Sequence, residues 1–90
     1  MLNTLENIFN LVRERKKSPV DGSYTNKLLS NKSLSKAKVL EEINELIEAV
    51  EKDTNKIHEA ADVIYHLTMY LEANNIMIED VMSELDKRKK

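Results

Sequence analysis

The chain has 90 residues, of which 41% are hydrophobic and 33% are charged, with one Gly, one Pro and no Cys. This composition is typical of a small, mostly helical domain, and the lack of Cys excludes disulfides and thiolate metal sites. The formal net charge of −2 does not favour nucleic-acid binding, and no apolar run approaches the ~20 residues of a membrane span. We therefore expect one cytoplasmic domain over residues 1–90, with no nucleic acid and no membrane as partner.

The first expected helix ends near Lys17, and its apolar residues recur at helical spacing: Leu2, Leu5, Ile8, Phe9 and Val12. Residues 18–23 hold the only Pro and the only Gly, so they are expected to stop this helix. Thr25 is expected to cap a short helix that reaches Leu29. Residues 30–35 then form a polar connection.

A second long helix is predicted from about Ser35 to Lys52, with one apolar stripe made of Val39, Leu40, Ile43, Leu46, Ile47 and Val50. At about 100° per residue, Glu42 and Glu45 lie at the edge of this stripe, whereas Glu41 lies further round. The pattern therefore predicts that Glu42 and Glu45 are the inward-facing acidic pair.

A third helix follows the turn at residues 53–55 and is expected to end near Asn74, with a last helix from about Ile78 to Arg88. The third helix is apolar or small around most of its circumference, which predicts a buried, central element. Its remaining side chains form a narrow polar strip at i, i+3, i+7 and i+11, made of Glu59, Asp62, His66 and Tyr70. We expect this strip to face an enclosed cleft.

Two acidic clusters, Glu41-Glu42-x-x-Glu45 and Glu59-x-x-Asp62, thus stand in consecutive helices. Carboxylates in largely apolar surroundings are costly to desolvate without cations, and several facing oxygen ligands suit a hard divalent metal, first of all Mg²⁺. By itself the first cluster is equally well explained by solvated glutamates that pair with nearby lysines. Asp62 favours a metal site, because Asp has low helix propensity and is unusual among core residues.

Three strings stand in a fixed order along the chain: Ser23-Tyr24-Thr25, Lys38-x-x-Glu41-Glu42-x-x-Glu45, and Glu59-Ala60-Ala61-Asp62-Val63-Ile64-Tyr65-His66-Leu67. Over nearly its whole length the chain resembles the phosphoribosyl-ATP pyrophosphatases, a family of all-α nucleoside-triphosphate (NTP) pyrophosphatases in the MazG-like superfamily. The resemblance implies an all-α, four-helix-type bundle with the all-α NTP pyrophosphatase fold. A homodimer is expected from the resemblance and from the limited surface that a 90-residue chain buries alone.

The resemblance implies Mg²⁺-dependent hydrolysis of phosphoribosyl-ATP to phosphoribosyl-AMP and pyrophosphate, the second step of histidine biosynthesis. The metal ligands that it implies are Glu42, Glu45, Glu59 and Asp62. Glu41 is either a further ligand or the group that orients the attacking water, and Lys38 completes a catalytic set with Glu41, Glu42 and Glu45. The residues implied to contact the substrate are Arg15, Ser23, Tyr24, Thr25, Lys27 and His66.

Purely structural roles are also compatible with two of these residues. His66 fits a hydrogen-bonded residue that supports the site from behind, and Tyr24 fits a loop residue that packs over the edge of the bundle. A general pyrophosphatase for free nucleoside triphosphates has the same acidic signature, although the Ser23-Tyr24-Thr25 string disfavours it. A non-catalytic helical oligomerisation module is the third possibility, disfavoured by the presence of all five acidic residues.

Overall fold

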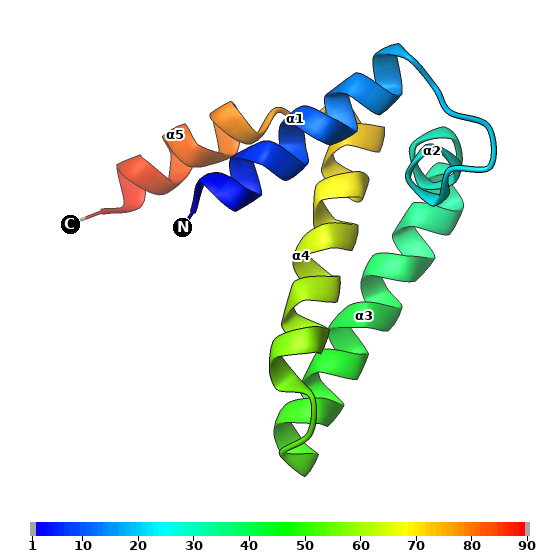
Figure 1. Ribbon diagram of the computed structural model, residues 1–90. Coiled ribbons are helices and arrows are strands. Elements are labelled where there is room, and N and C mark those ends of the chain that lie inside the picture. Colours follow the sequence, from blue (N-terminus) through cyan, green and yellow to red (C-terminus); the bar gives the residue numbers. More distant parts are fainter. Residues whose placement is uncertain (1, 90) are drawn as a thin grey trace.

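The computed structural model describes residues 2–89, and these form five helices: α1 (Asn3–Lys17), α2 (Tyr24–Ser30), α3 (Lys32–Lys52), α4 (Lys56–Ala73) and α5 (Ile78–Arg88) (Figure 1). Met1 and Lys90, the two ends of the predicted domain, lie outside the described residues. No strand occurs within residues 2–89, so the predicted all-α class is confirmed. Among the same residues, no helix combines the length and apolar character that crossing a membrane would require.

An antiparallel hairpin of α3 and α4 is the central element and makes the most extensive helix–helix contact (Figure 1). Its turn places Asp53 and Asn55 in the left-handed region, with φ of 55° and 39°. Asp and Asn adopt this conformation more readily than other residues that carry a Cβ. The short side chains at this turn therefore allow α4 to return along α3.

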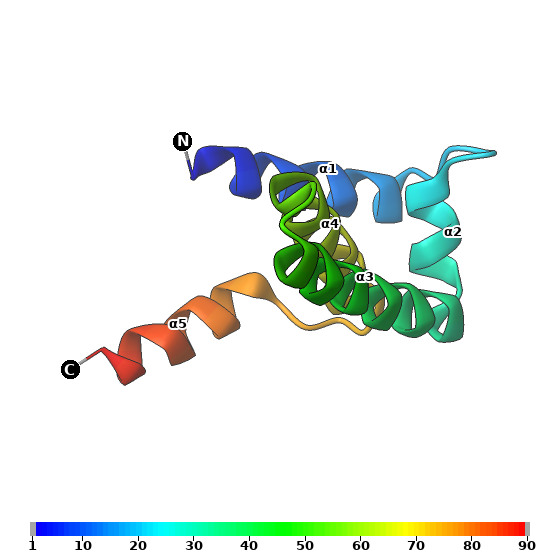
Figure 2. The same ribbon diagram turned by 90° about the horizontal axis from the view of Figure 1, so that it is seen from below.

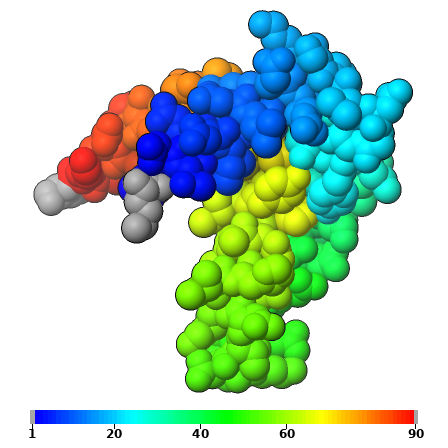
Figure 3. All heavy atoms as spheres, viewed as in Figure 1, coloured from blue at the N-terminus to red at the C-terminus, as the bar shows by residue number. Residues whose placement is uncertain are grey.

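The buried core lies where α1 and α2 meet α4. Val12, Leu28 and Met69 come from these three helices and are at most 1% exposed. Partly buried residues packed around them are Ile8, Leu29, Leu34 and Tyr65. In the space-filling view the lower part of the α3/α4 hairpin extends beyond this core as a separate limb (Figure 3).

Two predicted helix starts are wrong, and capping explains both. Residues 30–35 do not form a polar connection, because the Asn31 side chain accepts a hydrogen bond from the Leu34 amide (3.0 Å) and α3 begins at Lys32. Thr25 does not cap α2; Ser23 does, through its Oγ, which accepts from the Asn26 amide at 3.2 Å. In both cases the polar side chain just before the helix satisfies one of its free amides.

The third helix, predicted to be a buried, central element, contacts α1, α2 and α3 but is only partly covered within the single chain. Ile57, Ile64 and Leu67 of α4 are 88%, 47% and 42% exposed. The helices α1, α2 and α3 each lie along part of α4 (Figure 2). The exposed fractions show that an apolar face of the hairpin stays open. The open apolar residues of α3 are Leu40, Ile43, Ile47 and Val50.

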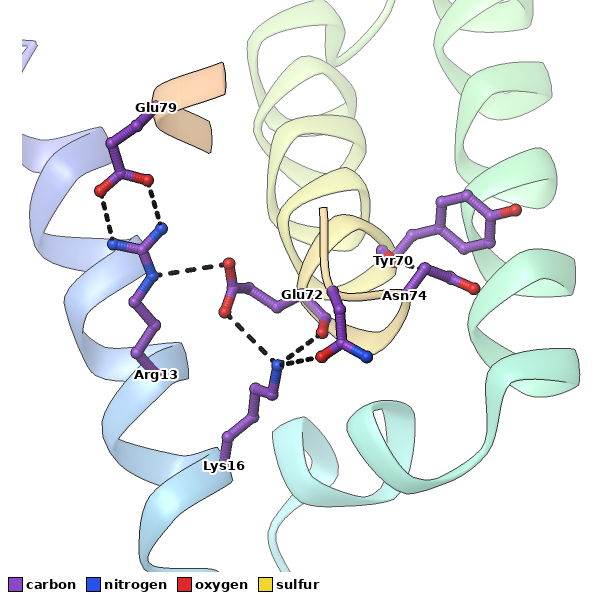
Figure 4. Close-up of polar contacts among 7 residues, drawn as sticks. Arg13, Lys16, Tyr70, Glu72, Asn74 and Glu79 are labelled. Carbon is purple, nitrogen blue, oxygen red and sulfur yellow. Dashed lines mark hydrogen bonds and ion pairs between the residues drawn. The ribbon is translucent and has the colours of Figure 1, made fainter. Parts of the chain in front are cut away.

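Charged contacts join α5 to α1. Arg13 donates two hydrogen bonds to the Glu79 carboxylate, at 2.9 and 2.7 Å, and its Nε lies 3.5 Å from the buried carboxylate of Glu72 (Figure 4). Lys16 donates to the Glu72 carbonyl oxygen at 2.8 Å. The guanidinium of Arg13 lowers the pKa of Glu79 to about 2. None of the described residues of α5 is buried, and the Arg13–Glu79 pair joins this helix to α1.

Candidate metal and substrate site

Three carboxylates converge on the inner side of the α3/α4 hairpin. Glu42 and Glu45 stand one turn apart on α3, and the hairpin brings Glu59 of α4 opposite them. One carboxylate oxygen from each residue lies within 4.8 Å of the other two. The structure thus brings together three of the four predicted metal ligands.

This cluster of three carboxylates has no positively charged partner among the described residues. Among residues 2–89, none of these three carboxylates forms a salt bridge, and one oxygen of Glu42 and one of Glu59 are buried without a hydrogen-bond partner. Burial raises the pKa of Glu42, and the neighbouring Glu45 raises it further. Burial and the charges of Glu45 and Asp62 likewise raise the pKa of Glu59. Raised pKa values in a cluster of acids mark a place where a cation would be stabilised.

Asp62, the fourth predicted ligand, belongs to a neighbouring group. Together with His58 and Glu59 it offers ligand atoms that all lie within 4.8 Å of one another. His58 Nε2 lies 3.3 Å from Asp62 Oδ2, one turn away on α4. Glu59 is common to both groups, so the two sets of donors form one continuous acidic strip. A strip of four carboxylates fits one or two divalent ions bound through oxygen.

Lys38 and Glu41 lie on α3 at the solvent side of this strip. Lys38 Nζ donates to Glu41 Oε2 at 3.2 Å, across one helical turn, and the Glu41 side chain is 51% exposed. Their hydrogen bond raises the pKa of Lys38, which stays a cation. Glu41 is thus much more exposed than Glu42, the buried carboxylate of the same string.

The loop between α1 and α2 is held in place by its own polar side chains. Arg15 donates to Ser23 Oγ at 3.0 Å, and the Asn26 side-chain amide donates to the Arg15 carbonyl at 2.7 Å. The Asn26 side-chain oxygen accepts from the Val20 amide at 2.8 Å. Gly22 has a φ of +78°, a conformation that is costly for residues with a Cβ. These bonds hold the loop in this shape.

This loop and α2 line an open cavity of about 800 Å³, a volume suited to a small-molecule ligand. Lys27, Ser23 and Tyr24, three of the residues predicted to contact substrate, are among its walls. Thr25 points instead into the protein, where it is 9% exposed and its hydroxyl lies 2.6 Å from that of Tyr65. Arg15 is not among the cavity-lining residues, and its contact with Ser23 supports the loop.

Comparison with known proteins identifies the relatives of this chain. The family model for phosphoribosyl-ATP pyrophosphohydrolase matches residues 4–89. A phosphoribosyl-ATP pyrophosphatase of Clostridium acetobutylicum is 45% identical over 89 residues, covering 93% of this chain and 79% of that protein. One from Clostridium novyi is 38% identical and covers 99% of this chain and 84% of that protein. The chain belongs to the phosphoribosyl-ATP pyrophosphohydrolase family.

A further relative in the phosphoribosyl-ATP pyrophosphohydrolase family is the histidine biosynthesis bifunctional protein HisIE of Pyrococcus furiosus. It is 39% identical over 90 residues, which are 99% of this chain and 43% of that protein. The match thus covers less than half of that bifunctional protein.

Two residues at this site were not predicted from the sequence. His58 precedes the acidic string and contacts Asp62, yet an exposed histidine beside an ExxD string gives no signal of its own. Asn26 holds the loop through three hydrogen bonds, which depend on the folded path of the chain. A turn-forming loop followed by Asn at the start of a helix is the weak signal that was available for Asn26.

Proposed function

We propose that this chain hydrolyses phosphoribosyl-ATP to phosphoribosyl-AMP and pyrophosphate, as the second step of histidine biosynthesis, with Mg²⁺ as cofactor. One observation carries the proposal: the carboxylates of Glu42, Glu45 and Glu59 converge, with one buried, unpartnered oxygen on Glu42 and one on Glu59, in a chain that matches this family over residues 4–89. An oligomerisation module would have no use for such a cluster, which is electrostatically unfavourable without a cation. A cytoplasmic location and a single domain over residues 1–90 belong to the same proposal.

The residues present fit a divalent metal, because all of the donors are hard oxygens and two are desolvated without a partner. Glu42, Glu45, Glu59 and Asp62 would hold it. When bound, the ion supplies positive charge to the phosphate oxygens and lowers the pKa of a bound water. Mg²⁺ suits this donor set better than Zn²⁺, which prefers nitrogen and sulfur ligands.

The chain's own residues bind and orient the polyphosphate around this cluster. Lys38 lies one turn before the acidic pair and can exchange its Glu41 partner for a phosphate oxygen of the substrate. Glu41, released from Lys38, is then an exposed carboxylate at the mouth of the site, where it can accept a proton from the attacking water. The water oxygen bonds to the α phosphorus as the anhydride bond between the α and β phosphates breaks, and the pyrophosphate leaves with the electron pair of this bond.

The loop between α1 and α2 forms the substrate-binding part of the proposed site. Ser23, Tyr24 and Lys27 line the cavity of about 800 Å³, and Lys27 supplies a cation there. We place the nucleotide or the added phosphoribosyl group in this cavity, with Arg15 and Thr25 supporting the loop from behind. A preorganised loop lowers the entropy that binding would otherwise cost.

We also propose that the protein is a homodimer through the open face of the α3/α4 hairpin. The described chain exposes 6658 Å², about 1,300 Å² more than the roughly 5,400 Å² expected of a compact monomer of this mass. Its radius of gyration of 14.1 Å likewise exceeds the roughly 12 Å expected for 90 residues. An excess of this size matches what one partner of a stable dimer buries. The apolar residues concerned are Leu40, Ile43, Ile47, Val50, Ile57, Ile64 and Leu67.

Pyrophosphate release tests the function directly. The purified protein is assayed with phosphoribosyl-ATP, ATP and a set of deoxynucleoside triphosphates, with Mg²⁺ and with EDTA. We expect Mg²⁺-dependent release that is fastest with phosphoribosyl-ATP. Equal or faster turnover of free triphosphates would instead assign a general pyrophosphatase, and no turnover of any of them would overturn the enzymatic proposal.

Glu42→Gln and Glu48→Gln form a matched pair for this assay. Both substitutions remove one negative charge from α3, but Glu48 pairs with Lys52 in solvent and lies outside the acidic strip. We expect Glu42→Gln to lower kcat/KM by at least about a hundredfold, in the range seen when a charge-stabilising group is removed from an active site. Glu48→Gln keeps the activity of the unmodified protein. Full activity in Glu42→Gln would refute the ligand assignment.

A further inference from the structure

Two neighbouring residues of the loop string contact two neighbouring residues of α4. Tyr24 Oη lies 2.9 Å from His66 Nε2, and Thr25 Oγ1 lies 2.6 Å from Tyr65 Oη. The rings of Tyr24 and His66 meet edge to face, with centroids 5.8 Å apart. Residues 42 positions apart in the sequence therefore meet as a pair, and a second pair with similar sequence separation stands beside it.

The hydrogen bond between Tyr24 and His66 has a fixed donor and a fixed acceptor. His66 Nδ1 lies 2.8 Å from the carbonyl oxygen of Asp62, and a carbonyl oxygen only accepts hydrogen bonds. Nδ1 must therefore carry a proton, which leaves Nε2 of the neutral ring as an acceptor. The hydroxyl of Tyr24 must then donate to Nε2. Its proton is committed to His66, and only the lone pairs of its oxygen remain for another partner.

This restriction decides what Tyr24 can contact. A hydroxyl whose proton is already donated cannot donate to a phosphate oxygen, so its next partner must be a donor. Tyr24 is 42% exposed, whereas His66 is 7% exposed and closes the inner end of the pair. The charges of Lys38, Glu41 and Glu42 all act on Tyr24, and burial raises its pKa so that it stays protonated. Lys38 is the cation among these neighbours, and its ammonium has three donors.

We infer that His66 is a positioning residue that fixes the Tyr24 hydroxyl so that its oxygen accepts a hydrogen bond from Lys38 and aims that ammonium at a substrate phosphate. The chain of donors then runs from Lys38 to Tyr24, from Tyr24 to His66 and from His66 to the Asp62 carbonyl. Asp62 is itself a proposed metal ligand, so one turn of α4 orients both the acidic strip and the opposing cation. The inference rests on the proposed function, and it adds a role that the acidic strip alone does not supply.

Kinetics on phosphoribosyl-ATP test the inference with a control that the structure provides. Tyr24→Phe and His66→Ala are each expected to lower kcat/KM about tenfold, the effect of one misdirected hydrogen bond to a charged group. The double variant is expected to be no worse than either single variant, because both remove the same link. His66→Gln, whose amide oxygen can accept from Tyr24, is expected to recover kcat/KM to within about threefold of the unmodified protein.

Tyr65→Phe is the matched control. It removes the neighbouring hydrogen bond between the same two helices without touching Tyr24, so we expect kcat/KM to change by less than about twofold. An equal loss in Tyr65→Phe and Tyr24→Phe would mean that both bonds only hold α2 against α4, and would overturn the inference. Multiplicative losses in the Tyr24/His66 double variant, or an unchanged rate in Tyr24→Phe, would overturn it as well.

Nitrogen-15 NMR of the histidine rings gives a readout that does not depend on turnover. The chain has two histidines, so His66→Gln assigns the His66 signals by their loss. At a pH where the ring is neutral, we expect a protonated Nδ1 and a bare Nε2, whose shift changes in Tyr24→Phe and not in Tyr65→Phe. A proton on Nε2 would refute the donor chain. Failure of the unmodified protein to hydrolyse phosphoribosyl-ATP would refute the proposed function instead, and would leave this measurement valid.

Discussion

Removing one charge from the carboxylate cluster should stabilise the protein without metal and weaken its response to metal. In Glu42→Gln the buried carboxylate that faces Glu45 and Glu59 becomes a neutral amide of the same shape. Two unit charges 4.8 Å apart repel by about 3.5 kcal/mol at an effective dielectric constant of 20, and by about 0.9 kcal/mol in bulk water. Glu45 and Glu59 are partly exposed, so we expect a gain of about 1–3 kcal/mol in the free energy of unfolding.

Scanning calorimetry at pH 8 in EDTA measures this gain. For a chain of this size, about 1–3 kcal/mol corresponds to an increase in Tm of roughly 4–20 °C. In the same scans, Mg²⁺ should raise the Tm of the unmodified protein more than the Tm of Glu42→Gln. An ion present at a hundredfold excess over its Kd stabilises the unmodified protein by about 2.7 kcal/mol, and the variant should gain much less. The protein concentration is held constant, because the Tm of a dimer depends on it.

Glu48→Gln distinguishes this effect from a general loss of negative charge on α3. Lys52 lowers the pKa of Glu48 through their hydrogen bond, whereas the pKa of Glu42 is raised. The loss of this exposed pair should leave Glu48→Gln only slightly destabilised, with its response to Mg²⁺ intact. A lower Tm of Glu42→Gln in EDTA, or an undiminished response of Glu42→Gln to Mg²⁺, would refute the proposed cation site.

The same contacts lead to three more predictions. Since the pKa values of Glu42 and Glu59 are raised in the folded state, their contribution to stability without metal is full below their ordinary pKa of 4.5 and is lost as the pH rises through the raised values. The Tm difference between Glu42→Gln and the unmodified protein in EDTA should therefore be small near pH 4 and grow toward pH 8, and a constant difference would contradict this linkage. Arg13→Gln should release α5, which would be measured as faster amide exchange in α5 with unchanged exchange in α3 and α4. Because the pKa of Glu79 is about 2, acid should release α5 only as the pH falls from about 4.5 toward 2. Ile47→Lys should convert a dimer into monomers in size-exclusion chromatography with light scattering, and a monomeric unmodified protein would refute the proposed interface.

The positions of the helices were largely predictable because their signals are local. The stop at residues 18–23, the turn at residues 53–55 and the start of the last helix at Ile78 all agree with the structure. The start of α3 was missed because a run of polar residues suits a loop and a capped helix start equally well, and only the bond from the Leu34 amide to Asn31 distinguishes them.

Which apolar faces are covered could not be predicted from periodicity. The pattern in α4 shows that the helix needs cover on most sides, but it does not show that α1, α2 and α3 supply it for only part of the surface. Ile57 is 88% exposed for this reason. The apolar pattern of α4 fits a buried helix only if a second copy of the chain covers its exposed side. The proposed homodimer would supply that cover.

In the candidate site, too, contacts that follow from local spacing were predictable, whereas contacts between distant parts of the chain were not. Spacing placed Glu42 and Glu45 on one face of α3, and a helical hairpin brings Glu59 opposite them, so their convergence was predictable. The contact of Tyr24 with His66 depends on how α2 docks on α4, across 42 residues, and no local pattern reports it. The resemblance to a family indicated that both strings matter, but not that they contact one another.

The inner face of the α3/α4 hairpin needs a cation, and its outer face needs an apolar partner surface. Its inner face holds carboxylates that repel one another until a cation binds, and its outer face holds apolar side chains that stay exposed until another surface covers them. Either feature alone lowers the stability of an isolated, metal-free chain. Binding of metal and pairing of two copies would act on the same two helices, so each should raise the stability on which the other depends. The dissociation constant of the dimer should therefore fall when Mg²⁺ is added to the unmodified protein and change much less in Glu42→Gln. Identical dissociation constants with EDTA and with Mg²⁺ would show that the two faces act independently.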